Sequence, residues 1–109
     1  MEIKRGDLVI ATLPGDYGKP RPVLVVQDDA FETVPSVTVL PLTSDVRNFP
    51  LFRISVNANS QTGLQTLSQI MVDKAGTVRR ERIGRHIGRV DPVTMQAAGT
   101  ALARFLGLE

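Results

Sequence analysis

The stretch GDYGKPRPVLVVQ, residues 15–27, joins a turn-rich segment to a run of apolar residues. Its two glycines lie between prolines, which predicts a loop with a mobile centre and fixed ends. The run 22–27 is short, rich in Val and Leu and bounded by Pro, which predicts a buried strand. Residues 8–13 have the same character. We therefore expect these two runs to pair as an irregular hairpin.

Further apolar runs extend this β pattern along the chain. Phe52, Ile54 and Val56 alternate with polar residues, which predicts a half-exposed antiparallel strand. Gly84 and Gly88 fall within the last apolar run and predict bulges or sharp bends there. Including this last run, the further strands are expected at residues 37–42, 51–57, 67–72 and 83–90.

The C-terminal segment has the features of a helix. Asp91 followed by Pro92 is typical of an N-cap and first turn, and Gly107 supplies a stop signal. The residues at helical spacing form an apolar stripe expected to lie on the sheet: Met95, Ala98, Ala101, Leu102, Phe105 and Leu106. The pattern predicts a mainly β (α+β) fold, a small bent antiparallel sheet or barrel with one C-terminal helix, as a single domain over residues 1–109.

Composition limits the classes of protein to consider. With 109 residues, of which 42% are hydrophobic and 22% charged, the chain matches an ordinary globular domain. The sequence has no Cys, so it cannot carry disulfides or a thiolate zinc site, which fits a reducing compartment. Its apolar runs are too short to span a bilayer. We expect a cytoplasmic protein without a membrane partner.

Basic residues gather in the second half of the chain, although the formal net charge is only +2. The cluster is opposed only by Glu81 and consists of Arg79, Arg80, Arg82, Arg85 and Arg89. Such a cluster forms either a solvated basic face or a surface that binds a polyanion.

Polar side chains stand where two of the predicted strands begin or end. Arg21 opens the strand 22–27, so its guanidinium is held close to the protein body and suits a phosphate or carboxylate. The alternative is a structural arginine that caps loop carbonyls or pairs with Asp28 or Asp29. Thr43 and Ser44 follow the strand 37–42 and on their own would only start a turn. In combination with Arg21 they predict a site.

Four blocks of the sequence, in order and with compatible spacing, resemble the MazF/PemK family of toxin endoribonucleases from type II toxin-antitoxin systems. These blocks are KRGDLVIATLPGDYGKPRPVLVVQDD, TVLPLTSD, GLQTLSQIMVDKAGTV and LARFLGL. The resemblance implies an SH3-like barrel with a C-terminal helix, a homodimer, a cognate antitoxin, and cleavage of single-stranded RNA without metal or cofactor. It implies catalytic roles for Arg21 and Thr43 and places Gln69 near the substrate groove. Met71 stands where family members often have a basic residue.

The chemistry implied is attack of the RNA 2′-hydroxyl on the adjacent phosphorus, which gives a 2′,3′-cyclic phosphate and a 5′-hydroxyl end. Arg21 is assigned to charge stabilisation and Thr43 to donation or orientation of the attacking hydroxyl. The residues expected to bind substrate are Asp16, Tyr17, Lys19, Ser44 and Gln69. Asp16 is also a candidate for assisting proton movement, and Tyr17 could stack on a base. His86 lies outside the matched blocks and is not assigned as the base. No metal-ligand spacing is present.

Two other functions fit the same architecture. The expected architecture also resembles that of the CcdB-type toxins, which bind DNA gyrase and do not cut RNA. The remaining alternative is a non-catalytic barrel that binds RNA or protein through the loop. A gyrase binder has no need for Arg21 beside Thr43, so this pair favours the nuclease over the gyrase binder. A binding module would retain affinity for RNA or peptide but give no cleavage product.

Overall fold

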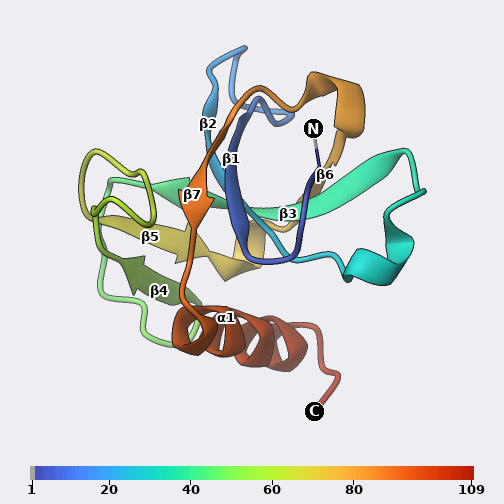
Figure 1. The fold of residues 1–109 in the computed structure, drawn as a ribbon. Helices are drawn as coiled ribbons and strands as arrows, with labels where there is room; N and C mark the ends of the chain where they lie inside the picture. Colours follow the sequence, from blue (N-terminus) through green and yellow to red (C-terminus); the bar gives the residue numbers. More distant parts are fainter. Residues whose placement is uncertain (1) are drawn as a thin grey trace.

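The computed structural model describes residues 2–109, which fold into a curled antiparallel sheet with one helix beneath it (Figure 1). Three 3-10 turns lie between the strands, at Asp29–Phe31, Val72–Lys74 and Arg80–Arg82. The longer elements, in chain order, are β1 (Asp7–Ala11), β2 (Arg21–Val25), β3 (Ser36–Thr43), β4 (Arg53–Val56), β5 (Ser68–Met71), β6 (Gly76–Arg79), β7 (His86–Arg89) and α1 (Pro92–Phe105). The predicted class, mainly β with a C-terminal helix, is confirmed.

The long strand β3 organises the sheet. The strand order is β4-β5-β3-β2-β1-β7, and β6 also pairs with β3. The first half of β3 pairs with β6, and its last two residues, Leu42 and Thr43, pair with β5. Because β3 is shared in this way, the sheet bends along it into a half-barrel whose path ends at β4 and β7 (Figure 1). The expected β1–β2 hairpin is confirmed, with Ala11 opposite Arg21.

Successive residues of the central strands are buried on opposite faces of the sheet. Leu8, Leu24 and Leu40 belong to one core, together with residues of β4, β5 and α1. Val9 and Val23 belong to a second core on the other face, inside the curl. Since side chains alternate across a strand, burial on both faces requires a continuous apolar sequence. This explains why the runs in β1, β2 and the second half of β3 lack the alternation seen in β4.

The helix α1 starts as predicted and packs on the leucine-rich core. The Oδ1 of Asp91 accepts a hydrogen bond of 2.7 Å from the backbone N–H of Thr94. Ala98 is fully buried, and the partly buried Met95, Ala101 and Leu102 pack against the same core. The prediction for the last turn was wrong, because Phe105 and Leu106 are 54% and 55% exposed. Within residues 2–109, no helix has the length and apolar character needed to cross a membrane.

Two strands differ from their predicted positions. β6 was not predicted, because the sequence of residues 76–79 buries only Val78 well and has little strand pattern of its own. β7 begins at His86 instead of Ile83, because Arg80–Arg82 forms a 3-10 turn just before it. The irregularity expected in this last run is present, since the β1–β7 register shifts between Leu8 and Val9.

Candidate functional site

Strand pairing brings Arg21 and Thr43 to the same end of the sheet. β2 and β3 are antiparallel, with Val23 opposite Pro41. Continuing this register by two residues places Arg21 opposite Thr43. The Nη1 of Arg21 also donates a hydrogen bond of 3.4 Å to the carbonyl of Leu42, the residue before Thr43. The guanidinium is therefore held beside the end of β3.

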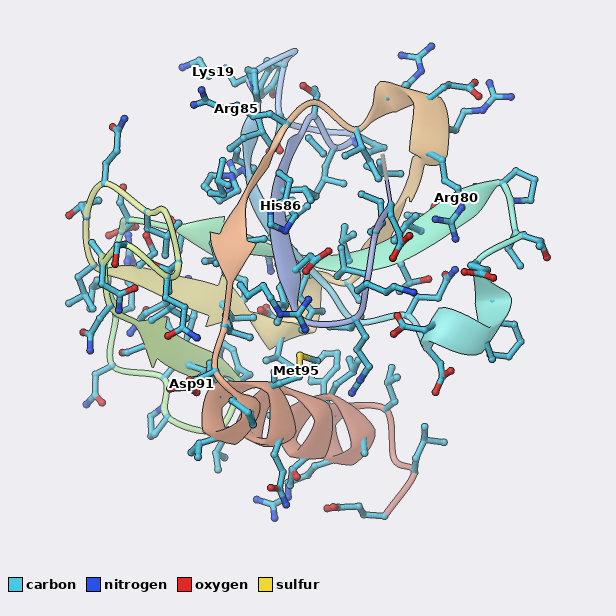
Figure 2. All side chains as sticks on the ribbon, in the orientation of Figure 1. Lys19, Arg80, Arg85, His86, Asp91 and Met95 are labelled. Atoms are coloured by element: carbon cyan, nitrogen blue, oxygen red, sulfur yellow. The ribbon has the colours of Figure 1, made fainter. Side chains whose placement is uncertain are left out.

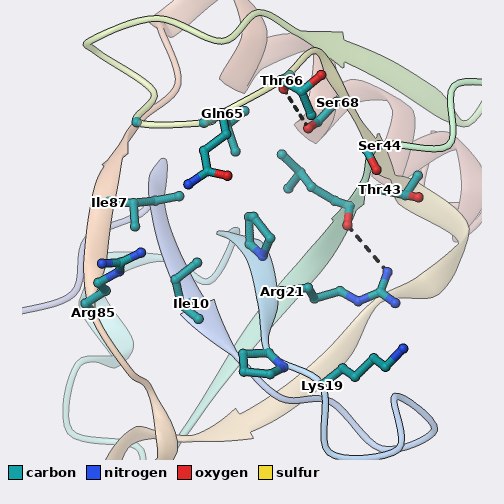
Figure 3. Close-up of a pocket in the computed structure, with 15 residues that line it drawn as sticks. Ile10, Lys19, Arg21, Thr43, Ser44, Gln65, Thr66, Ser68, Arg85 and Ile87 are labelled. Atoms are coloured by element: carbon teal, nitrogen blue, oxygen red, sulfur yellow. Dashed lines mark hydrogen bonds between the residues drawn. The ribbon is translucent and has the colours of Figure 1, made fainter.

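These residues line a groove of about 440 Å³ (Figure 3). Four of the seven predicted site residues are in it: Lys19, Arg21, Thr43 and Ser44. Arg21 and Thr43 lie on one side, and Gln65, Arg85 and Ile87 lie on the other (Figure 3). Among the described residues that line the groove, three carry a positive charge and none is an Asp or Glu.

Asp16 contacts Arg21 from behind this groove. The Oδ2 of Asp16 lies 3.0 Å from the Nε of Arg21, and the two side chains are 15% and 32% exposed. The pair is an ion pair without the alignment of a hydrogen bond. Asp16 does not line the groove itself and instead borders a second hollow that shares Arg21. The loop carboxylate thus fixes one edge of the guanidinium and leaves the other toward the groove.

The hydroxyl of Thr43 is oriented by the turn that follows β3. Its Oγ1 accepts a hydrogen bond of 3.1 Å from the backbone N–H of Asp45. This bond occupies a lone pair of the oxygen and leaves its O–H free to donate. Hydrogen bonding from Arg47 and then its positive charge hold the pKa of Asp45 below the ordinary value. The first turn after Thr43 therefore carries an ionised carboxylate paired with Arg47.

Gln69 lies outside the groove and is 6% exposed on β5. Its Oε1 accepts hydrogen bonds from the backbone N–H of Arg47 at 3.0 Å and from the Nη1 of Arg53 at 2.9 Å. Its Nε2 donates to the carbonyl of Arg47 at 3.0 Å. The two bonds to Arg47 tie the segment after Thr43 to the sheet, while the bond from Arg53 joins β4 to β5. Arg53 stands opposite Met71, so a neighbouring strand brings a cation to this position.

Two other residues singled out in the sequence also lie outside the groove. Tyr17 is 98% exposed at the tip of the β1–β2 loop and has a positive φ of 53°. His86 is on β7, where its Nε2 is 3.4 Å from the Oδ1 of Asp7. The structure therefore brings neither side chain to Arg21.

The arginine cluster does not form a single face. Arg80 donates hydrogen bonds to the carbonyls of Val34 and Phe31, which ties η3 (Arg80–Arg82) to the loop before β3. Arg89 pairs with the buried carboxylate of Asp7. Arg85 alone of the five lines the groove, and Figure 2 shows it near Lys19 and away from Arg80.

The wall of the groove opposite Arg21 was missed by sequence reasoning. Gln65 stands in this wall, Thr66 and Ser68 line the groove near Ser44, and Arg85 stands in the wall with Gln65 (Figure 3). The first three lie within the matched block GLQTLSQ, which is a signal that the sequence did contain. Arg85 was identified from the sequence only as a member of the arginine cluster and was not assigned to the site. Among residues 2–109, no three His, Asp or Glu side chains are grouped so that they could hold a metal ion.

Comparisons with known proteins agree over almost the whole chain. A family model described as PemK-like, MazF-like toxin of type II toxin-antitoxin system matches residues 4–106. A curated protein of Mycolicibacterium smegmatis, called probable endoribonuclease MazF, is 43% identical over 107 residues, which covers 97% of this chain and 98% of that protein.

Solved structures show the same fold. A mycobacterial endoribonuclease in complex with its cognate antitoxin is 27% identical, with a TM-score of 0.83 over 99% of this chain and 98% of that one. The Mycobacterium tuberculosis toxin MazF-mt6 is 28% identical, with a TM-score of 0.80 over 94% of this chain and 98% of that one.

Proposed function

This chain belongs to the PemK-like, MazF-like toxin family of type II toxin-antitoxin systems, and we propose that its groove is the active site of a MazF-type endoribonuclease. The substrate proposed is single-stranded RNA, cleaved without a metal ion or cofactor. The observation that supports this most strongly is that Arg21 and Thr43 face one groove that contains three cations and, among the described residues, no carboxylate.

Arg21 is assigned to the charge that develops on the phosphate. The 2′-hydroxyl attacks the adjacent phosphorus, the bond to the 5′-oxygen of the next nucleotide breaks, and the products are a 2′,3′-cyclic phosphate and a 5′-hydroxyl. A guanidinium with five fixed donors stabilises the negative oxygens of the transition state. The contacts of its Nε with Asp16 and of its Nη1 with the carbonyl of Leu42 limit the reorganisation needed during the reaction.

Thr43 is assigned to a neutral hydrogen bond in the same step. Because its oxygen already accepts from the Asp45 N–H, its proton points elsewhere and can be donated to a phosphate oxygen. Lys19 and Ser44 lie beside the pair and would bind neighbouring parts of the substrate. Asp16 would act by holding Arg21, while Tyr17 would contact RNA only beyond the groove. Gln69 would contribute by fixing the segment after Thr43.

The cognate antitoxin is proposed as the second partner. A solved relative is described as an endoribonuclease in complex with its cognate antitoxin. A cationic groove that is lined by no carboxylate within residues 2–109 would accept an acidic antitoxin segment in place of RNA. Activity as a cytoplasmic homodimer is part of the same proposal. A gyrase poison is the competing function, and it gives no reason for Arg21 and Thr43 to meet.

The test is cleavage of single-stranded RNA by the purified protein in the presence of EDTA. We expect products with 5′-hydroxyl ends and no cleavage when the 2′-hydroxyls are replaced by 2′-O-methyl groups. Arg21→Ala should abolish cleavage and Thr43→Val should reduce it strongly, with circular dichroism spectra unchanged. Intact RNA with wild-type protein, or unchanged cleavage by Arg21→Ala, would reject the proposed mechanism.

A further inference from the structure

One wall of the groove carries polar groups that the proposed chemistry does not use. Arg85 is exposed on the segment before β7, and within residues 2–109 its guanidinium has no hydrogen-bond or ion-pair partner. Gln65 is also exposed, and its side-chain amide makes no hydrogen bond within the described part of the chain. Both side chains stand across the groove from Arg21 (Figure 3).

The backbone under Arg85 is fixed even though its side chain is free. The carbonyl of Arg85 accepts a hydrogen bond of 2.9 Å from the N–H of Ile10, and the N–H of Gly84 donates to the carbonyl of Ile10 at 2.8 Å. These bonds attach the segment to β1 at the groove. The charge is therefore presented from a defined position instead of from a loose loop.

The segment that carries Gln65 is fixed against β7. Gly63 has a φ of +68°, and a Cβ on it would lie 1.9 Å from the carbonyl oxygen of Ile87. The N–H of Arg89 also donates to the carbonyl of Gln61 at 2.9 Å. Such close backbone contact leaves little room for the Gln65 segment to move relative to the strand. Gln65 and Arg85 thus form one preformed wall.

An apolar surface separates this wall from Arg21. Ile10 and Ile87 are half-buried, and both line the groove (Figure 3). An unpaired base can lie on such a surface, since its flat face is largely apolar while its edge carries donors and acceptors. A side-chain amide offers both a donor and an acceptor to that edge. The position of Gln65 above Ile10 and Ile87 fits this contact.

We propose that Arg85, Gln65 and this apolar surface form a second nucleotide subsite, which binds the nucleotide next to the cleaved linkage. Arg85 binds the phosphate of that nucleotide, and Gln65 contacts the edge of its base. The inference rests on the proposed function, because it takes single-stranded RNA as the ligand. It assigns to Arg85 a role that the other arginines of the cluster do not share, since Arg80 and Arg89 are engaged elsewhere.

The test for Arg85 uses Arg85→Gln with Arg82→Gln as the matched control. Both changes remove one positive charge within a few residues of each other, but Arg82 does not line the groove. The probe is a 2′-O-methyl RNA oligonucleotide that spans a mapped cleavage site, so binding is measured without cleavage. We expect Arg85→Gln to weaken binding about tenfold at low salt and Arg82→Gln to leave it nearly unchanged. The logarithm of the association constant decreases as the logarithm of the salt concentration rises. The magnitude of this slope should be smaller by about 0.7 in Arg85→Gln and unchanged in Arg82→Gln.

A second measurement locates the phosphate. Single methylphosphonate linkages remove one charge at a time from the same oligonucleotide. In the wild type, one linkage beside the cleaved one should weaken binding, and in Arg85→Gln that same linkage should cause no further loss. Additive losses at every linkage would overturn the assignment of Arg85 to a phosphate.

Gln65→Ala tests the contact with the base. We expect it to change the relative cleavage of RNAs that differ at one position next to the cleaved linkage, with little change in the salt slope. If Gln65→Ala reduced cleavage equally whichever of the four bases stood at that position, this part of the inference would be overturned. A wild-type protein that cuts no RNA rejects the proposed function. A wild type that cuts RNA while Arg85→Gln behaves like Arg82→Gln rejects only the second subsite.

Discussion

Two aspartate–arginine pairs in this protein use the same chemistry for different ends. Asp7 pairs with Arg89 across β1 and β7, and its carboxylate is 4% exposed. Asp7 also accepts a hydrogen bond of 2.8 Å from the N–H of Lys4 and has His86 at 3.4 Å. Asp16, by contrast, has Arg21 as its ion-pair partner among residues 2–109 and is 15% exposed.

The two pairs differ in how many hydrogen-bond and ion-pair partners each carboxylate has. A buried carboxylate with several donors is costly to disturb, so the Asp7 pair holds β7 to the sheet. The Asp16 pair joins a loop to the head of a strand and has fewer partners, so one edge of Arg21 remains available to another anion. The fully satisfied pair contributes stability, and the partly satisfied pair suits binding.

The largest expected effect is on RNA cleavage by Arg21→Met. Loss of the guanidinium should lower kcat/KM by about a thousandfold, because its bonds strengthen in the transition state. The free energy of unfolding should change by less than about 1 kcal/mol, since Asp16 can be hydrated when its loop moves. Cleavage assays and urea unfolding measure the two effects. A large loss of stability would show that the two pairs are not different in kind.

Arg89→Met should have the opposite effects, with a clear loss of stability and little change in cleavage. It leaves the carboxylate of Asp7 buried without its main partner, and we expect a loss of about 2–3 kcal/mol in urea unfolding. This value is below the roughly 3–5 kcal/mol expected for a fully buried pair, because the side chain of Arg89 is 49% exposed. Cleavage per folded molecule should remain close to wild type.

Arg104→Met is the control for this change. Its guanidinium is 65% exposed and lies 3.6 Å from Glu109, so the loss should be below about 0.5 kcal/mol. Equal destabilisation by the two substitutions would mean that the burial of Asp7 has no energetic consequence.

Asp16→Asn should have a moderate effect that separates kcat from KM. The amide no longer anchors Arg21, so kcat should fall about tenfold. It also removes a negative charge that competes with the substrate phosphate, so KM should stay the same or decrease. Steady-state kinetics on a defined RNA at two salt concentrations distinguish these changes. A rise in KM with unchanged kcat would show that Asp16 binds substrate directly.

Apart from the Arg104→Met control, the smallest effect concerns the N-cap of α1. Hydrogen bonds from Thr94, first its side chain and then its backbone N–H, hold the pKa of Asp91 below the ordinary value. The cap therefore contributes stability above the pKa of the unfolded chain, and this contribution is lost as pH falls through the lower folded pKa. Asp91→Ala should lower the melting temperature by a few degrees at pH 7. The difference should narrow below about pH 4. A difference that does not change with pH would contradict this account.

Much of the fold could be predicted because its signals are local. Continuous apolar runs marked β1, β2 and β3, alternation marked β4, and the Asp91 cap marked the start of α1. The last turn of α1 was misjudged, because helical spacing places Phe105 on the apolar face but cannot tell how far the sheet extends beneath it. β6 was missed because its position depends on pairing with β3.

The residues of the candidate site also differ in whether local sequence signals could identify them. Arg21 and Thr43 could be found from the sequence because each stands at a strand end and within a block that resembles the family. Arg85 and Gln65 could not be assigned to the groove, since nothing in the residues near either one states what lies across from it. Gln69 was placed near the groove by resemblance, whereas its buried hydrogen bonds hold the segment after Thr43.

The sequence by itself determined the strands, the helix and the chemistry available at the ends of β2 and β3. Those properties follow from side-chain period, backbone propensity and residue type over a few neighbouring positions. Only the tertiary structure decided which arginine lines the groove and which pairs with the buried carboxylate of Asp7. A cation acquires its role from the partner that the packed sheet places beside it, and residues as far apart as Asp7 and Arg89 meet only when the sheet forms.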